Sequence, residues 1–242
     1  MENIPADRRV LVIIPAYNEE KSIAEVLLKL RAAAPDYDRV VVNDGSRDQT
    51  ARVVRGMGEK LLHLSTNLGY GRALQTGMKY ALQKGYGVVV CLDADGQHRP
   101  EDVPCLVRAL LDEKVDMVIG SRFSGGRPYN TPINRRIGQL LFSLLTRLLL
   151  GQRIYDTSSG FKALRLATCE EIIQMTFMDF HIETIVRLSL TGFKIVEYPV
   201  IVYERTTGQS MHSISSTFSY PVKTLLLTLV TAFDVLLSRR TR

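Results

Sequence analysis

The chain has 242 residues, of which 45% are hydrophobic and 23% charged, and no low-complexity tract interrupts it. This composition excludes a fibrous or largely disordered protein and suits one large globular domain. The formal net charge of +6 favours an anionic partner, which could be a nucleic acid, a membrane headgroup or a phosphorylated substrate. Three cysteines without CxxC spacing argue against a disulfide framework and predict a reducing, cytoplasmic compartment.

Apolar runs that predict β-strands alternate with helical patterns along the first half of the chain. Strands are expected over residues 10–17, 39–45, 60–65, 86–94 and 115–121, and helices over residues 19–34, 71–85 and 99–114. Several of the strands are rich in Val and Ile without polar alternation, which is typical of strands covered on both faces. The order of elements predicts an α/β fold with a mostly parallel, Rossmann-like sheet and helices on both faces.

Beyond residue 122 the pattern loosens. A loop over residues 124–134 leads to a Leu-rich helix at 135–151, followed by a helix near 178–191 and a strand at 194–204. Residues 1–211 are therefore expected to form the main domain, and residues 212–242 an apolar and basic helical segment.

The apolar run of that C-terminal segment, Thr224–Phe233, is too short to span a bilayer and ends at Asp234. We expect this helix to lie on a membrane surface, or to pack in the core or in a homo-oligomer contact.

Polar or glycine-containing groups follow all five predicted strands. They read PAYNEE, NDGS, STNLGYG, DADGQH and GSRF. Any one of them is also ordinary turn chemistry, but ligands of open parallel sheets bind beyond the carboxyl ends of the strands. Together they predict a binding site at this edge.

The group DADGQH carries the sharpest chemistry. Asp93 and Asp95 are two apart in an extended segment, so their side chains project to the same face. With the amide oxygen of Gln97 they form an oxygen-ligand set for Mg²⁺ or Mn²⁺ that leaves positions open for phosphate oxygens. The alternative is an Asx-turn that caps the helix beginning near Pro100, and His98 alone is no evidence for a ligand.

Other phosphate-binding motifs fit less well. The sequence has no GxxxxGK[ST] motif. The stretch GYGRAL begins like a dinucleotide-binding fingerprint, with Gly69 and Gly71, but Leu74 stands where a third small residue belongs. NAD-linked redox chemistry therefore stays a weak rival, and it gives NDGS and Gln97 no role.

In this order, PAYNEE, NDGS, DADGQH and GSRF resemble the family 2 glycosyltransferases, which have the GT-A fold. The later stretches DTSSGFKALR and ERTTGQS are similar to the branch of dolichyl-phosphate mannosyltransferase and other polyprenyl-phosphate glycosyltransferases, and the resemblance covers residues 9–211. It implies a metal-dependent transfer, with Mg²⁺ or Mn²⁺, of a sugar from a GDP- or UDP-sugar to a polyprenyl phosphate. It also implies an enzyme peripheral to the cytoplasmic face of a membrane, with no nucleic-acid partner.

The resemblance also implies roles for individual residues. Nucleotide-sugar binding falls to Pro15, Ala16, Tyr17, Glu19, Val42, Asp44, Asn67, Gly69, Asp93, Ala94, Asp95, Arg122 and Arg205. The metal would be held by Asp93, Asp95 and Gln97, and the acceptor phosphate by Arg135 and Ser210. The catalytic set would be Asp95, Asp156, Arg122 and Glu183.

Two departures from the family pattern concern the substrates. Asn43 replaces the first Asp of the usual DDGS, and Met211 stands where mannosyltransferase relatives have Lys, so another sugar or UDP remains open. If the acceptor is instead a saccharide or protein hydroxyl, a carboxylate base is needed, and Asp156, Asp179 and Glu183 are the candidates in that order. A nucleotide-sugar-binding protein without turnover is the remaining alternative.

Some of these residues also have ordinary structural explanations. Arg135 could be a solvated helix end and Asp156 a turn residue. Glu183 could be an exposed helix residue that pairs with Arg187 at i+4.

Overall fold

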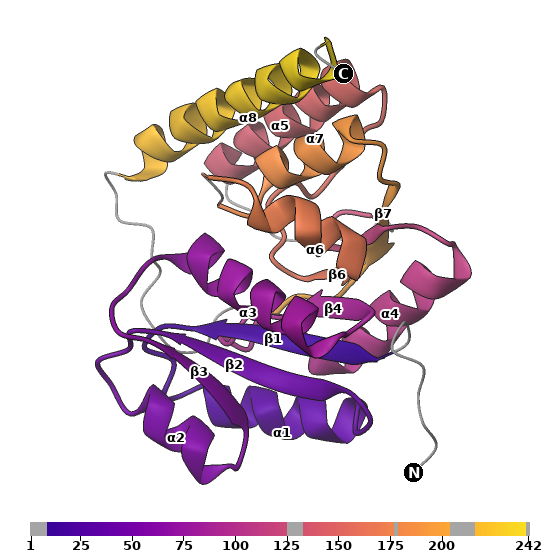
Figure 1. Cartoon of the computed structure of the whole chain (residues 1–242). Coiled ribbons are helices and arrows are strands. Elements are labelled where there is room, and N and C mark those ends of the chain that lie inside the picture. The colour runs from indigo at the N-terminus through magenta and orange to yellow at the C-terminus, as the bar shows by residue number, and fades with distance from the viewer. Residues whose placement is uncertain (1–8, 125–132, 177–178, 204–215, 241–242) are drawn as a thin grey trace.

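A central seven-stranded sheet organises the molecule (Figure 1). The computed structural model describes residues 9–124, 133–176, 179–203 and 216–240. The strands are β1 (Val10–Ala16), β2 (Asp38–Asp44), β3 (Lys60–Leu64), β4 (Val88–Cys91), β5 (Met117–Ser121), β6 (Lys162–Arg165) and β7 (Ile195–Pro199). Their order across the sheet is β3-β2-β1-β4-β6-β5-β7.

The sheet is mostly parallel, which confirms the expectation from the sequence. Only β6 runs against its neighbours, since it pairs antiparallel with both β4 and β5, whereas β5 and β7 pair parallel. Every residue of β1 is buried, as the unbroken apolar sequence predicts for a strand covered on both faces.

Helices cover both faces of the sheet. They are α1 (Ile23–Ala33), α2 (Thr50–Gly56), α3 (Tyr70–Lys84), α4 (Val103–Asp112) after a 3₁₀ turn (Pro100–Asp102), α5 (Ile133–Leu150), α6 (Leu166–Ile173), α7 (Ile182–Leu190) and α8 (Ser216–Arg240). One core cluster joins the sheet to α1 and α4, and another joins it to α3, α6 and α7. The predicted layers are therefore present.

Three helices, α5, α7 and α8, lie together at the end of the molecule that is uppermost in Figure 1. Ile182 and Val186 of α7 pack with Ala232 of α8 in a small apolar cluster, to which α5 also contributes. An ion pair of 3.2 Å between Arg187 and Asp234 adds to the contact of α7 with α8. Within the part of the chain that the structure describes, no helix is both long and apolar enough to cross a membrane.

Candidate active site

The carboxyl ends of the parallel strands bring several of the predicted site residues to one edge of the sheet. Asp44 ends β2, Asp93 follows β4 and Arg122 follows β5. Beside β2 and β3 lies a pocket of about 270 Å³, lined by Tyr17, Gly45, Ser46, Arg47, His63, Ser65, Thr66 and Asn67. Tyr17 and Asn67, two of the predicted nucleotide-binding residues, thus border this pocket.

The loops after β1 and β2 hold each other in place beside this pocket. The backbone N–H of Asn18 donates to Ser46 Oγ at 3.0 Å, and the N–H of Arg47 donates to Asn18 Oδ1 at 2.8 Å. Glu19, one of the predicted nucleotide-binding residues, donates its N–H to Thr50 Oγ1 at 2.8 Å. The PAYNEE and NDGS motifs therefore form one preorganised wall.

Three other predicted nucleotide-binding residues lie within the strands. They are Pro15 and Ala16 of β1 and Val42 of β2, and all three are buried.

Asp44 holds the loop that leads into α3. Its carboxylate is 3% exposed and accepts the backbone N–H of Leu68 at 2.7 Å and that of Gly69 at 2.9 Å. Gly69 has a φ of +92°, a conformation that favours glycine. Asp44 therefore fixes the loop between β3 and α3, and its part in nucleotide-sugar binding stays a prediction.

Asp93 lies in a tight polar cradle. Tyr70 Oη donates to Asp93 Oδ1 at 2.8 Å, and His98 Nε2 lies 3.9 Å from Asp93 Oδ2. A Cβ atom on Gly160 would come within 2.8 Å of Asp93 Oδ2 and would also meet Tyr70 Oη. Only glycine at position 160 leaves room for this arrangement.

His98 is neutral at pH 7 because burial lowers its pKa to about 4, so its approach to Asp93 is not an ion pair there. The ring packs on Phe161 with 5.1 Å between centroids. Its Nδ1 atom has no hydrogen-bond partner among the described residues.

Asp95 forms the Asx-turn that was the alternative to a metal site, but it does not cap the next helix. Asp95 Oδ1 accepts the N–H of Gln97 at 3.0 Å, while α4 begins without any side-chain cap. Gln97 Nε2 donates to the carbonyl of Tyr203 at 3.3 Å, and its amide oxygen accepts no bond from the described residues. Ala94, between the two acids, is buried.

These groups fit a hard divalent cation that takes its other ligands from a substrate. Among the described residues no three His, Cys, Asp or Glu side chains gather to hold a metal by themselves. The chain offers the carboxylates of Asp93 and Asp95 and the amide oxygen of Gln97, which suits Mg²⁺ or Mn²⁺ with phosphate oxygens completing the shell.

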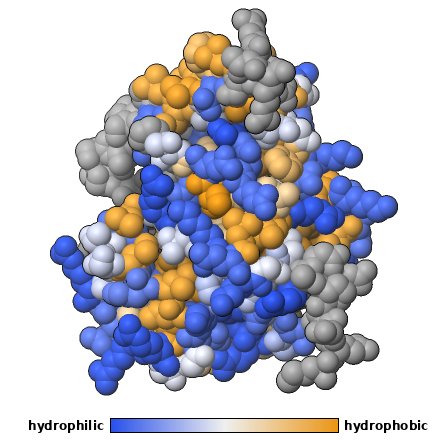
Figure 2. Space-filling model, in the orientation of Figure 1, coloured by the Kyte–Doolittle hydropathy of each residue, from blue (hydrophilic) through white to orange (hydrophobic). Residues whose placement is uncertain are grey.

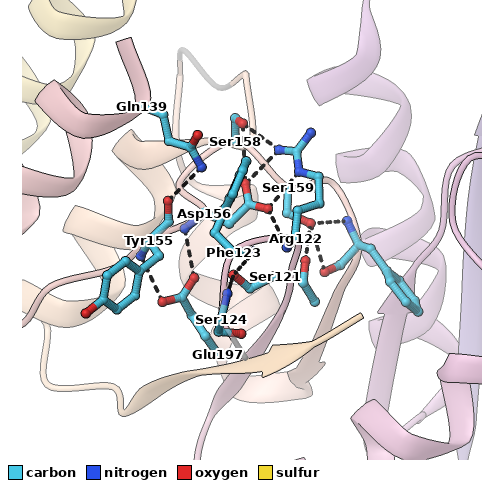
Figure 3. A network of polar contacts seen from close by, with 12 residues as sticks. Ser121, Arg122, Phe123, Ser124, Gln139, Tyr155, Asp156, Ser158, Ser159 and Glu197 are labelled. Atoms are coloured by element: carbon cyan, nitrogen blue, oxygen red, sulfur yellow. Dashed lines mark hydrogen bonds and ion pairs between the residues drawn. The ribbon is translucent and has the colours of Figure 1, made fainter. Parts of the chain in front are cut away.

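Arg122 is held by a fully buried carboxylate (Figure 3). Its Nε and Nη2 donate to the two oxygens of Asp156 at 2.8 and 2.7 Å, and Nη2 also donates to Ser158 Oγ at 2.8 Å. The Arg122 guanidinium holds the pKa of Asp156 below its ordinary value although burial acts to raise it. Asp156 therefore holds Arg122 in place, and its lowered pKa and its two bonded oxygens make it poorly suited to accept a proton as a general base.

Glu197 of β7 supports this pair from below, as Figure 3 shows, and sequence reasoning missed it. Its carboxylate accepts the backbone N–H groups of Tyr155 and Asp156, both at 2.8 Å. Burial raises the pKa of Glu197. Glu197 is embedded in a strand-like sequence, so nothing in the pattern marks it.

Glu183 is fully buried at the start of α7. Its Oε1 atom accepts the N–H of Asp179 at 2.9 Å and that of His181 at 3.0 Å. The alternative of an exposed residue paired with Arg187 is wrong, because Arg187 pairs with Glu171 and Asp234 instead. Glu183 thus bonds back to the backbone of the turn that leads into α7.

Lys162 of β6 is the second residue that sequence reasoning missed. It lies inside the quoted stretch DTSSGFKALR, and its side chain is fully buried. Burial lowers its pKa to about 8, and Glu183 is the charge that most opposes this shift. The strand β6 has a basic residue at each end, so nothing in its sequence marks Lys162 as the buried one.

Three predicted residues cannot be placed in this site. Arg205 and Ser210 lie outside the described residues, and the structure describes only the backbone of Arg135, in the first turn of α5. The role of Arg205 in binding the nucleotide sugar, and those of Arg135 and Ser210 in binding the acceptor phosphate, stay predictions.

Comparison with known proteins identifies the family. The model of the family described as "Glycosyl transferase family 2" matches residues 11–173. The chain belongs to glycosyltransferase family 2. It is therefore a glycosyltransferase, as the motif order indicated.

This family 2 enzyme has relatives of similar length. It is 37% identical to an undecaprenyl-phosphate mannosyltransferase of Micrococcus luteus, over 85% of this chain and 88% of the relative. It is 34% identical to a polyprenol monophosphomannose synthase of Mycolicibacterium smegmatis, over 86% of this chain and 83% of that relative.

Its fold matches glucosyl-3-phosphoglycerate synthase from Mycobacterium tuberculosis, solved with Mn²⁺, uridine diphosphate and phosphoglyceric acid. The TM-score is 0.69 at 19% identity, covering 93% of this chain and 78% of that one. This likeness confirms the expected GT-A fold.

Proposed function

We propose that this glycosyltransferase moves a sugar from a nucleoside-diphosphate sugar, GDP- or UDP-linked, to a polyprenyl phosphate, with Mg²⁺ or Mn²⁺ as cofactor. The names of the two curated relatives support the lipid-phosphate acceptor. The observation that most directly supports the donor is the meeting of Asp93, Asp95 and the oriented Arg122 at one edge of the sheet. Two acids and a fixed cation there suit a diphosphate bridged by metal.

The donor would lie across the edge of the sheet. Its base would enter the pocket beside Tyr17 and Asn67, and its diphosphate would extend toward Asp93 and Asp95. Both loops of the PAYNEE and NDGS wall are fixed before the donor arrives, which reduces the ordering cost of binding.

The reaction would be a single displacement at the anomeric carbon. An acceptor oxygen forms the new bond to this carbon while the bond to the nucleotide's phosphate oxygen breaks, and the nucleoside diphosphate leaves with the electron pair. Attack opposite the leaving group inverts the anomeric centre. When bound, the divalent ion supplies a Lewis acid to the diphosphate. Arg122, fixed by Asp156, is placed to stabilise the charge that develops on the leaving oxygen.

A polyprenyl phosphate is already an anion, so this reaction needs no strong base. This agrees with the side chains present, because Asp156 is bonded to Arg122 and Glu183 is bonded to the start of α7. Positioning of the acceptor then matters more than proton transfer, and Arg135 and Ser210 are our candidates for it.

The apolar helices α5 and α8 are the proposed contact with the membrane that holds such an acceptor. Exposed apolar side chains are Leu140, Leu141, Leu144 and Leu148 on α5, and Leu225, Leu226, Leu229, Val230, Phe233, Leu236 and Leu237 on α8. Figure 2 shows hydrophobic residues gathered at the end of the molecule where Figure 1 places these helices. Peripheral attachment here would deliver a lipid phosphate from the same side as α7.

A panel of nucleotide sugars, each tested with undecaprenyl and dolichyl phosphate, tests this proposal. We expect diphosphate release and a labelled lipid product with at least one pair. Release that needs a saccharide or peptide hydroxyl instead would favour the hydroxyl acceptor. Tight nucleotide binding without turnover with any acceptor would favour the non-catalytic alternative.

A further inference from the structure

A buried ammonium group lies beneath the site. Lys162 is 0% exposed, and among the described residues its Nζ donates one hydrogen bond, to the carbonyl of Phe180. The same ammonium lies 4.0 Å from the centre of the Phe180 ring. No carboxylate of the described residues forms an ion pair with it. Because burying a charge costs free energy, a strand that retains one in this way needs a reason beyond packing.

The Phe180 backbone has a left-handed conformation, which is unfavourable for a bulky residue. Its φ is +65°, and its side chain is fully buried. Lys162 donates to the carbonyl of Phe180. The backbone N–H groups of the residues on either side, Asp179 and His181, donate to Glu183. The turn 179–183 is thus fixed by two buried charged groups, Lys162 and Glu183.

The Phe180 ring in turn touches the side chain that orients a predicted metal ligand. Its centroid lies 6.5 Å from that of Tyr70, with the rings inclined by 57°. Tyr70 donates its hydroxyl to Asp93 Oδ1 at 2.8 Å. A continuous set of contacts therefore runs from Lys162 through Phe180 and Tyr70 to Asp93.

We propose that Lys162 is a positioning residue for the metal-binding carboxylate Asp93, acting through Phe180 and Tyr70. This rests on the proposed function, because it assumes a cation at Asp93. Groups that orient a metal ligand from outside the ligand shell change metal affinity by about 10–100-fold when they are removed. Lys162 would thus act on the metal site without touching the substrate, whereas Arg122 is proposed to contact the diphosphate itself.

Calorimetry of GDP and UDP binding tests this inference, with Mn²⁺ and with a chelator. The quantity compared is the gain in nucleotide affinity that Mn²⁺ confers. We expect Lys162→Met and Tyr70→Phe each to lower this gain by about tenfold. The double variant should lose no more than the stronger single one, since both act on the same contact chain.

The thermal midpoint separates this role from a purely structural one. Replacing a poorly paired buried charge with an apolar side chain of similar volume is often neutral or stabilising, so Lys162→Met should keep its melting temperature. Val107→Ala, a buried truncation in α4 on the opposite face of the sheet, is the control and should leave the Mn²⁺ gain unchanged. If Lys162→Met does not fold, Phe180→Leu takes its place. This variant removes the ring that contacts both Lys162 and Tyr70, and it should show the same loss of the Mn²⁺ gain.

Two results would overturn the inference. One is a Mn²⁺ gain within twofold of wild type in Lys162→Met, or in Phe180→Leu where that variant takes its place. The other is a double variant whose loss equals the product of the two single losses. If the wild type itself shows no Mn²⁺ gain with either nucleotide, the proposed function fails, which is a distinct outcome.

Discussion

The buried carboxylate of Asp156 fixes the orientation of the neighbouring Arg122 guanidinium. Asp156 accepts three hydrogen bonds from Arg122, two from the guanidinium and one, of 3.0 Å, from the backbone N–H. A bidentate pair of this kind fixes the plane of the guanidinium, which lysine could not reproduce. The cation is thus preorganised before a diphosphate arrives.

Asp156→Asn should lower the transfer rate by about 10–100-fold, because Arg122 loses its ionic partner while the side-chain shape is kept. Steady-state kinetics with a saturating donor would measure this. Glu101→Gln, a change at a half-exposed carboxylate that faces Arg99 on the surface, is the control and should leave the rate unchanged.

The same pair should make the stability of the protein sensitive to acid. The folded-state pKa of Asp156 is depressed, so its stabilisation is present above the ordinary value of 3.8 and is lost as pH falls through the lower folded value. Denaturant unfolding between about pH 5 and 3 should show a steeper loss for wild type than for Asp156→Asn. Equal slopes would mean that the pair contributes nothing to folding.

Gly160 should tolerate no side chain. Gly160→Ala places a Cβ atom against Asp93 and Tyr70, so we expect the Mn²⁺-dependent gain in nucleotide affinity to fall by about tenfold. Gly56→Ala is the matched control, because a Cβ atom there meets nothing within 4 Å. Unchanged nucleotide binding in Gly160→Ala would contradict the cradle described for Asp93.

Residues at strand exits could be predicted from sequence, whereas residues that support them could not. Asp93 and Arg122 stand next to apolar runs, so their place at the sheet edge follows from the strand pattern. Tyr70, Lys162 and Glu197 act through contacts with residues distant in the chain, and no local pattern records such contacts.

Among the elements, every strand except β6 was predicted, and the two helices that were not predicted, α2 and α6, are short. The strand β6 has only four residues and two basic ends, and α2 and α6 have seven and eight residues. Periodicity needs a longer window to be recognised. The antiparallel insertion of β6 matters for the site, because it places Lys162 between β4 and β5.

Glu183 lies in the first turn of α7, and its bonds to the turn before this helix can be tested separately from catalysis. Glu183→Gln keeps an oxygen acceptor for the N–H groups of Asp179 and His181, so we expect near-native activity with a polyprenyl phosphate. Glu183→Ala leaves both groups unpaired and should cost about 1–3 kcal/mol in the free energy of unfolding. Loss of transfer in a stable Glu183→Gln variant would instead identify Glu183 as the base for a hydroxyl acceptor.

At the scale of the whole molecule, the exposed apolar residues of α5 and α8 are the proposed contact with a membrane. Phe233 is 64% exposed on α8. Phe233→Asp should lower binding to vesicles of phosphatidylglycerol by about tenfold or more, since it removes a large apolar contact and adds a repelled charge. Co-sedimentation would measure this.

Leu28→Asp is the matched control, because Leu28 is 58% exposed on α1, on the face of the sheet away from α7. It should leave vesicle binding unchanged. Equal binding by Phe233→Asp and wild type would rule out α8 as the contact with the membrane, and dimerisation through the same helices would then be measured by light scattering.

The whole account depends on a cation that joins Asp93 and Asp95 to a diphosphate, and one titration tests it most directly. Affinity for GDP and UDP is measured by calorimetry with Mn²⁺ and with chelator, in wild type and in Asp95→Asn. We predict that Mn²⁺ strengthens binding of at least one nucleotide by about tenfold or more in wild type, and that Asp95→Asn loses most of this gain. Identical affinities with Mn²⁺ and with chelator in the wild type would contradict the account.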